Sequence, residues 1–211
     1  MGSVANNLVK TNQSILSLHE CNKALKDVYL STFSLLAAFE TGKMTMGCLS
    51  AALGPSTESL RKPVLRAEDQ GLLKIDGYVT VIEGKKPQTA RGMTLEGRTF
   101  LNTLRGALGT SGQKKKSSEE LGSLYQEMKE LGKIKIPTLI ALTAIDNGLT
   151  RTTEIYTFLD LERKACNVQI DQLIKRGYIE VVERKLIDGR KTRILGIADK
   201  GRSVLTTLAK V

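Results

Sequence analysis

Two stretches of the sequence carry side chains that can form hydrogen bonds with the edges of DNA bases. They span residues 57–66 and 163–169, where hydroxyl, amide and basic side chains are interspersed with apolar ones. Arginine can donate to guanine O6 and N7, and asparagine or glutamine can pair with adenine N6 and N7. The base-reading candidates are Thr57, Ser59, Arg61, Lys62, Arg163, Lys164, Asn167 and Gln169, and Arg66 is expected at a phosphate.

A basic segment with the pattern of a β-hairpin follows each of these stretches. Asp188-Gly189 is a strong turn signal in the second half, whereas the first-half segment GKKPQTARG lacks an Asp-Gly tip. Basic hairpin side chains can neutralise phosphates, although a single such residue is as often merely solvated. The hairpin candidates for phosphate binding are Lys85, Lys86, Arg91, Lys185, Arg190, Lys191 and Arg193.

The composition is that of a folded protein with an excess of positive charge. Of the 211 residues, 41% are hydrophobic and 26% charged, so we expect a packed core rather than disorder. The formal net charge is +10, which favours a polyanionic partner. Aromatic residues make up only 4%, which argues against a surface that stacks single-stranded bases or RNA.

Residues that commonly serve catalysis or metal binding are sparse. Cys21, Cys48, Cys166 and the one histidine, His19, lack the spacing of a zinc or iron–sulfur site. The phosphate-binding loop, GxSxG and HExxH patterns are all missing from the sequence. We therefore expect no enzyme, no cofactor and no metal. Without a secretory pattern or an apolar run of ~20 residues, a cytoplasmic, nucleoid-associated protein that does not enter a membrane is expected.

The two halves of the chain resemble each other at a nearly constant offset. Two glycines of the first half recur 106 residues later, and a third recurs 104 residues later, which places a two-residue length difference in a hairpin. Similarity at a fixed offset indicates a duplicated structural unit. The paired glycines are Gly42 with Gly148, Gly71 with Gly177, and Gly97 with Gly201.

The periodicity of each half predicts three helices, a hairpin and a closing helix. In the second half, the first helix ends at Asn147-Gly148, and Thr152 is the expected N-cap of a short second helix. In the first half, Pro63 predicts a shortened third helix, from about Leu60 to Gln70 with Ser59 as its N-cap, because proline is tolerated only in a first turn.

Composition also suggests where the domains begin and end. GTSGQKKKSS is typical of a linker, and Ser117 with Glu120 forms a capping-box pattern at the start of a helix. An amphipathic N-terminal helix is expected from Ile15, Leu18, Cys21, Leu25 and Val28, to be covered by its own domain or by a second copy of the chain. The expected regions are 1–28 (N-terminal helix), 29–108 (domain 1), 109–117 (linker) and 118–211 (domain 2).

The order of elements is that of a winged helix, and LIKRGYIEVVERKLIDGRKTRILGIADKGRSVL resembles the MarR-type family of bacterial regulators. The resemblance covers about residues 136–211 and is carried by Leu173–Arg176 before Gly177, the Asp188-Gly189-Arg190 tip and Lys200-Gly201. The first half, about 29–104, resembles the same unit more faintly. The resemblance implies a mainly α structure with small β-hairpins (α+β), built as two tandem winged helix-turn-helix domains, and pairing through terminal helices.

The expected function is sequence-specific binding of double-stranded DNA by a transcription regulator. Its two different recognition helices and two basic hairpins would read two unlike half-sites. A replication initiator or DNA-partition factor remains an alternative, as does a winged-helix module that docks on polymerase or another protein. Besides double-stranded DNA, a second copy of the chain and RNA polymerase are the partners considered.

Overall fold

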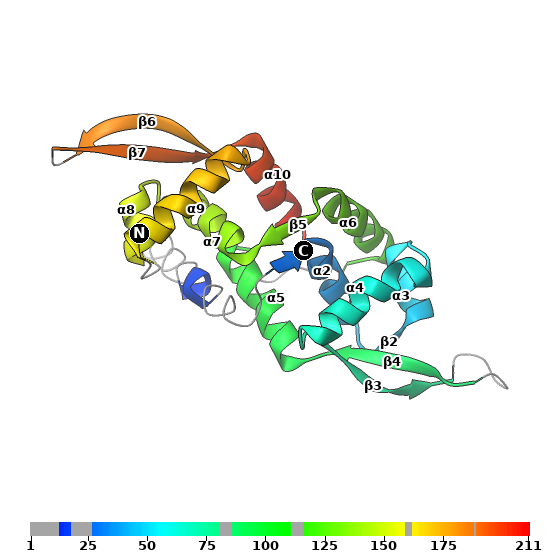
Figure 1. Cartoon of the computed structure of the whole chain (residues 1–211). Coiled ribbons are helices and arrows are strands. Elements are labelled where there is room, and N and C mark those ends of the chain that lie inside the picture. Colours follow the sequence, from blue (N-terminus) through cyan, green and yellow to red (C-terminus); the bar gives the residue numbers. More distant parts are fainter. Residues whose placement is uncertain (1–12, 18–26, 81–85, 111–115, 159–161, 188) are drawn as a thin grey trace, which may run out of the picture. The chain divides into compact units, whose positions relative to one another are not determined.

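The computed structural model describes residues 13–17, 27–80, 86–110, 116–158, 162–187 and 189–211. The structure is mixed α and β, with small antiparallel sheets (Figure 1). Its packing forms two compact units, each of which we describe by itself. The first-half unit comprises Val28–Asn102, Ser111–Lys133 and Lys210–Val211, and the second-half unit comprises Met1–Asp27, Thr103–Thr110 and Ile134–Ala209.

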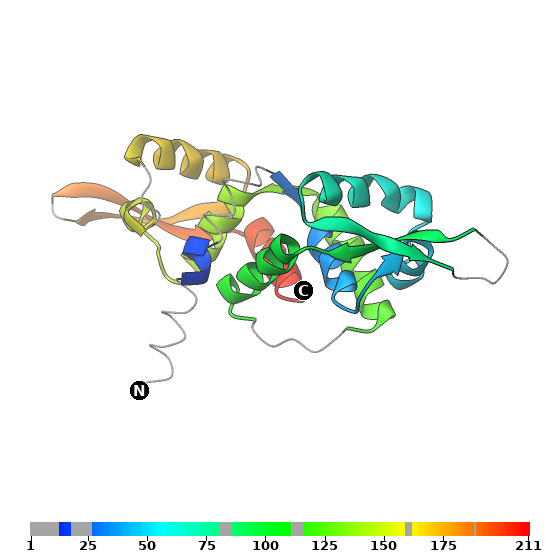
Figure 2. The same cartoon turned by 90° about the horizontal axis from the view of Figure 1, so that it is seen from below.

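The first-half unit combines helices with a three-stranded antiparallel sheet. The strand order is β2-β4-β3, and the β3–β4 hairpin projects beyond the helices of its unit (Figures 1 and 2). A bulge between Ile75 and Tyr78 interrupts the register of that hairpin. The elements are α2 (Ser31–Phe39), β2 (Met44–Thr45), α3 (Met46–Leu53), α4 (Thr57–Asp69), β3 (Leu73–Val79), β4 (Gln88–Met93), the first part of α5 (Leu95–Ala107) and α6 (Ser118–Leu131).

In the second-half unit, three helices, a two-stranded hairpin and a closing helix follow one another, the order in which α2, α3, α4, β3, β4 and α5 occur in the first half. Ile187 pairs with Arg190 across the tip, and Gly189 has a φ of 71°, which confirms the predicted turn position. Asp188 lies outside the described residues. The elements are α7 (Ile136–Asp146), α8 (Thr152–Phe158), α9 (Arg163–Lys175), β6 (Ile179–Ile187), β7 (Arg190–Ile197) and α10 (Asp199–Leu208); strands β1 (Asp27–Tyr29) and β5 (Lys133–Lys135) span the unit boundaries.

The ends of α4 and α9 share one hydrogen-bonding pattern. After α4, the Gly71 N–H donates to Glu68 O at 2.8 Å and the Leu72 N–H donates to Ala67 O at 2.9 Å. After α9, Gly177 donates to Ile174 O and Tyr178 to Leu173 O, both at 3.0 Å. Both glycines have a positive φ, the left-handed conformation that ends a helix in this way.

A second shared feature is the close approach of a glycine in the closing helix to a backbone carbonyl just after α4 or α9. A Cβ atom at Gly97 would lie 2.2 Å from Leu72 O, and one at Gly201 would lie 2.2 Å from Tyr178 O. The same two carbonyls accept hydrogen bonds from Thr94 N–H and Ala198 N–H, each at 3.1 Å. Two of the three glycine pairs that mark the repeat in the sequence, Gly71 with Gly177 and Gly97 with Gly201, therefore have repeated backbone geometry.

Helix α6 packs within the first-half unit, against α2 and α3. Its buried side chains are Leu121, Leu124, Tyr125 and Met128, all on one face. The sequence-based boundary at residues 109–117 placed this helix in domain 2, whereas the packing of the chain groups it with residues 28–102. The predicted capping box is confirmed: the Glu120 N–H donates to Ser117 Oγ, and the Ser117 N–H donates to the Glu120 carboxylate at 2.7 Å.

The N-terminal segment is described only in part. Residues 13–17 are helical and belong to the second-half unit, where Ile15 is fully buried and a Cβ at Gly106 would lie 2.3 Å from Ser14 Oγ. The expected helix through Val28 is wrong at its end, because Val28 lies in strand β1. Leu18, Cys21 and Leu25 lie outside the described residues.

Two predictions of where helices begin are wrong. Helix α4 starts at Thr57 and is as long as α9, 13 residues, because the Ser56 side chain accepts from Ser59 N–H and caps the helix a turn earlier than expected. Pro63 is therefore inside the helix. Thr152 is the first residue of α8 rather than its N-cap, since the Glu154 carboxylate accepts from Arg151 N–H at 2.9 Å.

Within the part of the chain that the structure describes, none of the helices has the length and apolar character needed to cross a membrane.

Candidate functional site

Helix α9 separates its apolar residues from the candidate base-reading residues. Cys166, Ile170 and Leu173 are buried in the unit. Arg163 and Lys164, in the first turn, are exposed. These two cations stand at the N-terminal end of the helix, which itself carries partial positive charge. The remaining candidates on this helix, Asn167 and Gln169, are half-buried.

A hollow of about 120 Å³ lies between α8, the start of α9 and strand β7. It brings together Arg163 and Asn167, predicted to read bases, with Lys191 and Arg193, predicted to bind phosphate. Lys164 and Gln169 are not among its lining residues. The complete lining is Thr152, Thr153, Tyr156, Arg163, Asn167, Lys191, Thr192 and Arg193.

The cations around this hollow differ in whether they form an ion pair with a carboxylate. Arg193 forms an ion pair with Asp171 on α9, and its side chain is 28% exposed. Arg163 and Lys191 are exposed and, among the described residues, form no ion pair. Two unpaired positive charges and one paired charge therefore surround a space bounded by hydroxyl and amide groups.

Thr152 contributes a buried polar atom to the same place. Its side chain lines the hollow, the residue is 8% exposed, and its Oγ1 has no hydrogen-bond partner within the described part of the chain. Most buried hydroxyls in proteins have a partner, so one without a partner calls for an explanation. The hollow depends on the approach of β7 to α8 and α9, which no sequence signal reveals.

In the first-half unit, α4 exposes all five of its candidate residues. Thr57, Ser59, Arg61 and Lys62 are exposed, while Leu60, Val64 and Ala67 are buried. The Ser59 hydroxyl lies 3.0 Å from Ser56 Oγ at the helix cap.

Arg66, which is also exposed, lies over an aromatic ring. Its guanidinium carbon lies 4.1 Å from the centre of the Tyr29 ring, and the Lys133 ammonium lies 5.9 Å from the same centre. Such cation–π contacts favour a fixed position of the cation over the ring face.

The hairpin candidates fall into exposed and paired groups. Arg91 donates to Glu68 at 2.8 Å, and both side chains are largely buried, so Arg91 ties β4 to α4. Lys185 pairs with Glu183 on its own strand at 2.9 Å. Lys86, like Lys191, is exposed. Lys85 lies outside the described residues, as does the side chain of Arg190, whose backbone is in β7 opposite Ile187.

The β3 strand also carries exposed apolar residues that sequence reasoning did not single out. Ile75 is 58% exposed, Tyr78 72% and Val79 44%. The duplicated unit predicts a hairpin in this part of the first half, but it does not predict which side chains of the hairpin are exposed.

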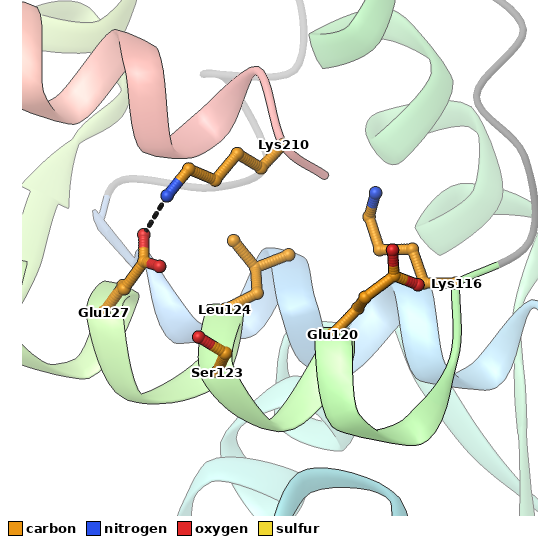
Figure 3. A pocket seen from close by; sticks show the side chains of 6 residues that line it. All are labelled: Lys116, Glu120, Ser123, Leu124, Glu127 and Lys210. Atoms are coloured by element: carbon orange, nitrogen blue, oxygen red, sulfur yellow. Dashed lines mark hydrogen bonds and ion pairs between the residues drawn. The ribbon is translucent and has the colours of Figure 1, made fainter.

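A larger hollow, about 400 Å³, lies along α6 in the first-half unit (Figure 3). Glu127 and Lys210 form an ion pair at 2.5 Å at one end, and Lys116 and Glu120 lie at the other. The hydrogen bonds from Ser117 lower the pKa of Glu120. Ser123 and Leu124 complete the lining. The hollow therefore carries balanced charge, and none of these residues is a candidate from the sequence.

No family model matches the chain, and no match is found among the curated proteins or among the solved structures.

Proposed function

We propose that this protein binds double-stranded DNA in a sequence-specific way and regulates transcription, and that each half of the chain is a winged helix-turn-helix unit. Helices α9 and α4 are the proposed recognition helices. The hairpins β6–β7 and β3–β4 are the proposed wings.

The observation that carries the proposal is the convergence around one hollow of Arg163 and Asn167 from α9 with Lys191 and Arg193 from β7. A DNA reader needs base contacts from a helix in the major groove and phosphate contacts that fix the register of that helix. The sequence alone assigned these four residues to the two roles. The hollow brings both kinds of residue to one surface of the second-half unit.

The repeated backbone geometry supports the second part of the proposal. Helices α4 and α9 have the same length and the same hydrogen bonds at their C-terminal ends, and an antiparallel hairpin follows each. Their first turns differ, however, because Thr57 and Glu58 stand where α9 has Arg163 and Lys164. Two unlike recognition helices would read two unlike half-sites, so we propose an asymmetric operator.

A protein-docking function is the second candidate, and the first-half unit favours it. Ile75, Tyr78 and Val79 on β3 expose apolar surface, whereas the nearby cations Arg91 and Lys43 are paired with Glu68 and Asp76. Exposed apolar groups of this kind are typical of surfaces that bind other proteins.

Selection of bound duplexes from a random library by the full chain tests the proposal. The selected duplexes should share one asymmetric motif, and footprinting should show protection of it by the wild-type chain and its loss in Arg163→Ala. Enrichment of no motif, with equal binding of selected and random duplexes, would contradict sequence-specific reading. The position of the motif, at promoters or at repeated origin sites, separates a transcription regulator from a replication initiator or partition factor.

A further inference from the structure

We propose that the hollow between α8, α9 and β7 is a binding site for a single phosphate group, in which the Thr152 hydroxyl donates a hydrogen bond and Lys191 and Arg193 supply positive charge. The inference rests on the proposed function only in taking the backbone of a DNA duplex as the source of the phosphate. The binding chemistry does not depend on that source.

The shape and charge of the hollow suit one phosphate group. Its volume is about 120 Å³, and Lys191 and Arg193 line it; Lys191 is exposed and forms no ion pair among the described residues. Arginine can bind two phosphate oxygens at once, and lysine acts as a mobile point charge. Asn167 and Tyr156 add polar groups to the wall of the hollow.

The Thr152 hydroxyl is the second and independent observation. It is a polar atom in a residue more than nine-tenths buried, without a hydrogen-bond partner in the described structure, on an element that lines the hollow. A buried hydroxyl without a partner destabilises a folded protein. An anion in the hollow would accept the hydrogen bond that the protein itself does not provide.

The Asp171 carboxylate competes with that anion for the Arg193 guanidinium. It binds this guanidinium, so Arg193, which lines the hollow, is partly neutralised in the free protein. Asp171 is not itself a lining residue. Removing its charge should release Arg193 to the phosphate and strengthen binding, which is the opposite of what a substitution that damages the site would do.

The experiment uses the full chain and two probes, a fixed DNA duplex and inorganic phosphate. Duplex affinity is measured by fluorescence anisotropy, and phosphate binding is measured by the increase in melting temperature that it causes. Thr152→Val removes the hydroxyl at nearly constant shape, and Thr157→Val, on the exposed side of α8, is its matched control. Asp171→Asn is matched by Asp146→Asn, an exposed aspartate at the end of α7.

Thr152→Val should weaken duplex binding about tenfold for every sequence, because it removes one hydrogen bond to a charged group. It should also abolish stabilisation by phosphate, whereas Thr157→Val and Thr152→Ser should behave as wild type. Asp171→Asn should strengthen duplex binding about two- to fivefold relative to Asp146→Asn, as expected for release of one exposed ion pair.

Wild-type affinity for both probes in Thr152→Val would overturn the proposal, even if Arg163→Ala shows that the chain reads DNA. If no duplex binds, but phosphate stabilises the wild type and not Thr152→Val, the site is upheld with a free phosphorylated molecule as its source, and the proposed function fails. Should Thr152→Val not fold, as judged by circular dichroism, equal affinities of Asp171→Asn and Asp146→Asn would overturn the proposal instead.

Discussion

Replacing Gly201 by alanine tests the close approach that both halves of the chain share. The new Cβ would lie 2.2 Å from Tyr178 O and 3.0 Å from side-chain atoms of Leu142 and Ile197, so the start of α10 and the chain after α9 must move apart. The Tyr178 carbonyl also accepts a hydrogen bond from Ala198 N–H at 3.1 Å, which this movement would stretch.

The expected loss of stability follows from three contributions. Overpacking in a well-packed site costs about 1–3 kcal/mol. Loss of the hydrogen bond costs about 1 kcal/mol, and the higher helix propensity of alanine returns about 1 kcal/mol. The net loss is therefore about 1–3 kcal/mol, and Gly97→Ala should lose a similar amount because its Cβ would meet Leu72 O at the same 2.2 Å.

Gly122→Ala is the matched control, because it is also a helical glycine but has an ordinary nearest contact, 3.4 Å to Leu53 O. It should be neutral or should stabilise the protein by up to about 1 kcal/mol. Thermal unfolding followed by circular dichroism measures all three variants, with a change of about 2–4 °C expected for each kcal/mol in a chain of this size. Gly201→Ala or Gly97→Ala melting at or above the temperature of Gly122→Ala would refute the reasoning.

Three further outcomes are expected. Arg163→Ala should weaken binding to the selected duplex by about 1–3 kcal/mol and relax one base position, whereas Lys191→Ala should weaken all duplexes alike in the same titration; equal losses on selected and random duplexes would contradict the two roles. Burial raises the pKa of the Cys166 thiol, so alkylation mapped by mass spectrometry should label it more slowly than the exposed Cys48, and equal rates would contradict that burial. Burial alone would raise the pKa of Glu154, but the hydrogen bonds from Arg151 and the positive charge of Arg151 outweigh it and lower the pKa below the ordinary value of 4.5. The ionised Glu154 therefore stabilises the folded protein above pH 4.5, and this stabilisation is lost as the pH falls through the lowered pKa. Glu154→Gln should therefore flatten the acid limb of the free energy of unfolding, and an unchanged acid limb would show that the pair contributes nothing.

The local features of the fold could be predicted because short-range chemistry determines them. Asn147-Gly148 ends a helix, Ser117 and Glu120 cap one, and Gly189 occupies a two-residue turn, each through contacts within a few residues. The predicted start of α4 is wrong because Ser56 and Ser59 are both good N-cap residues. Only the three-dimensional structure shows that the Ser56 side chain accepts the capping hydrogen bond, from Ser59 N–H.

The partners of helices and the hollow could not be predicted in the same way. The apolar face of α6 requires a partner, but its leucines would fit against helices of either half, and the structure places them against α2 and α3. Likewise, Arg163 and Lys191 could be named as candidates from the sequence. Their association with Thr152 depends on how α8, α9 and β7 pack, which is a long-range property of the fold.

The salt dependence of duplex binding tests the central claim most directly. Titration of the full chain with its selected duplex should give an association constant that falls linearly in a log–log plot against salt, with a slope of about −0.9 for each phosphate contact. Lys191→Ala should reduce the magnitude of that slope by about one. Absence of saturable binding to any duplex at low salt, or an affinity that salt and Lys191→Ala leave unchanged, would contradict the claim that this protein binds the DNA backbone.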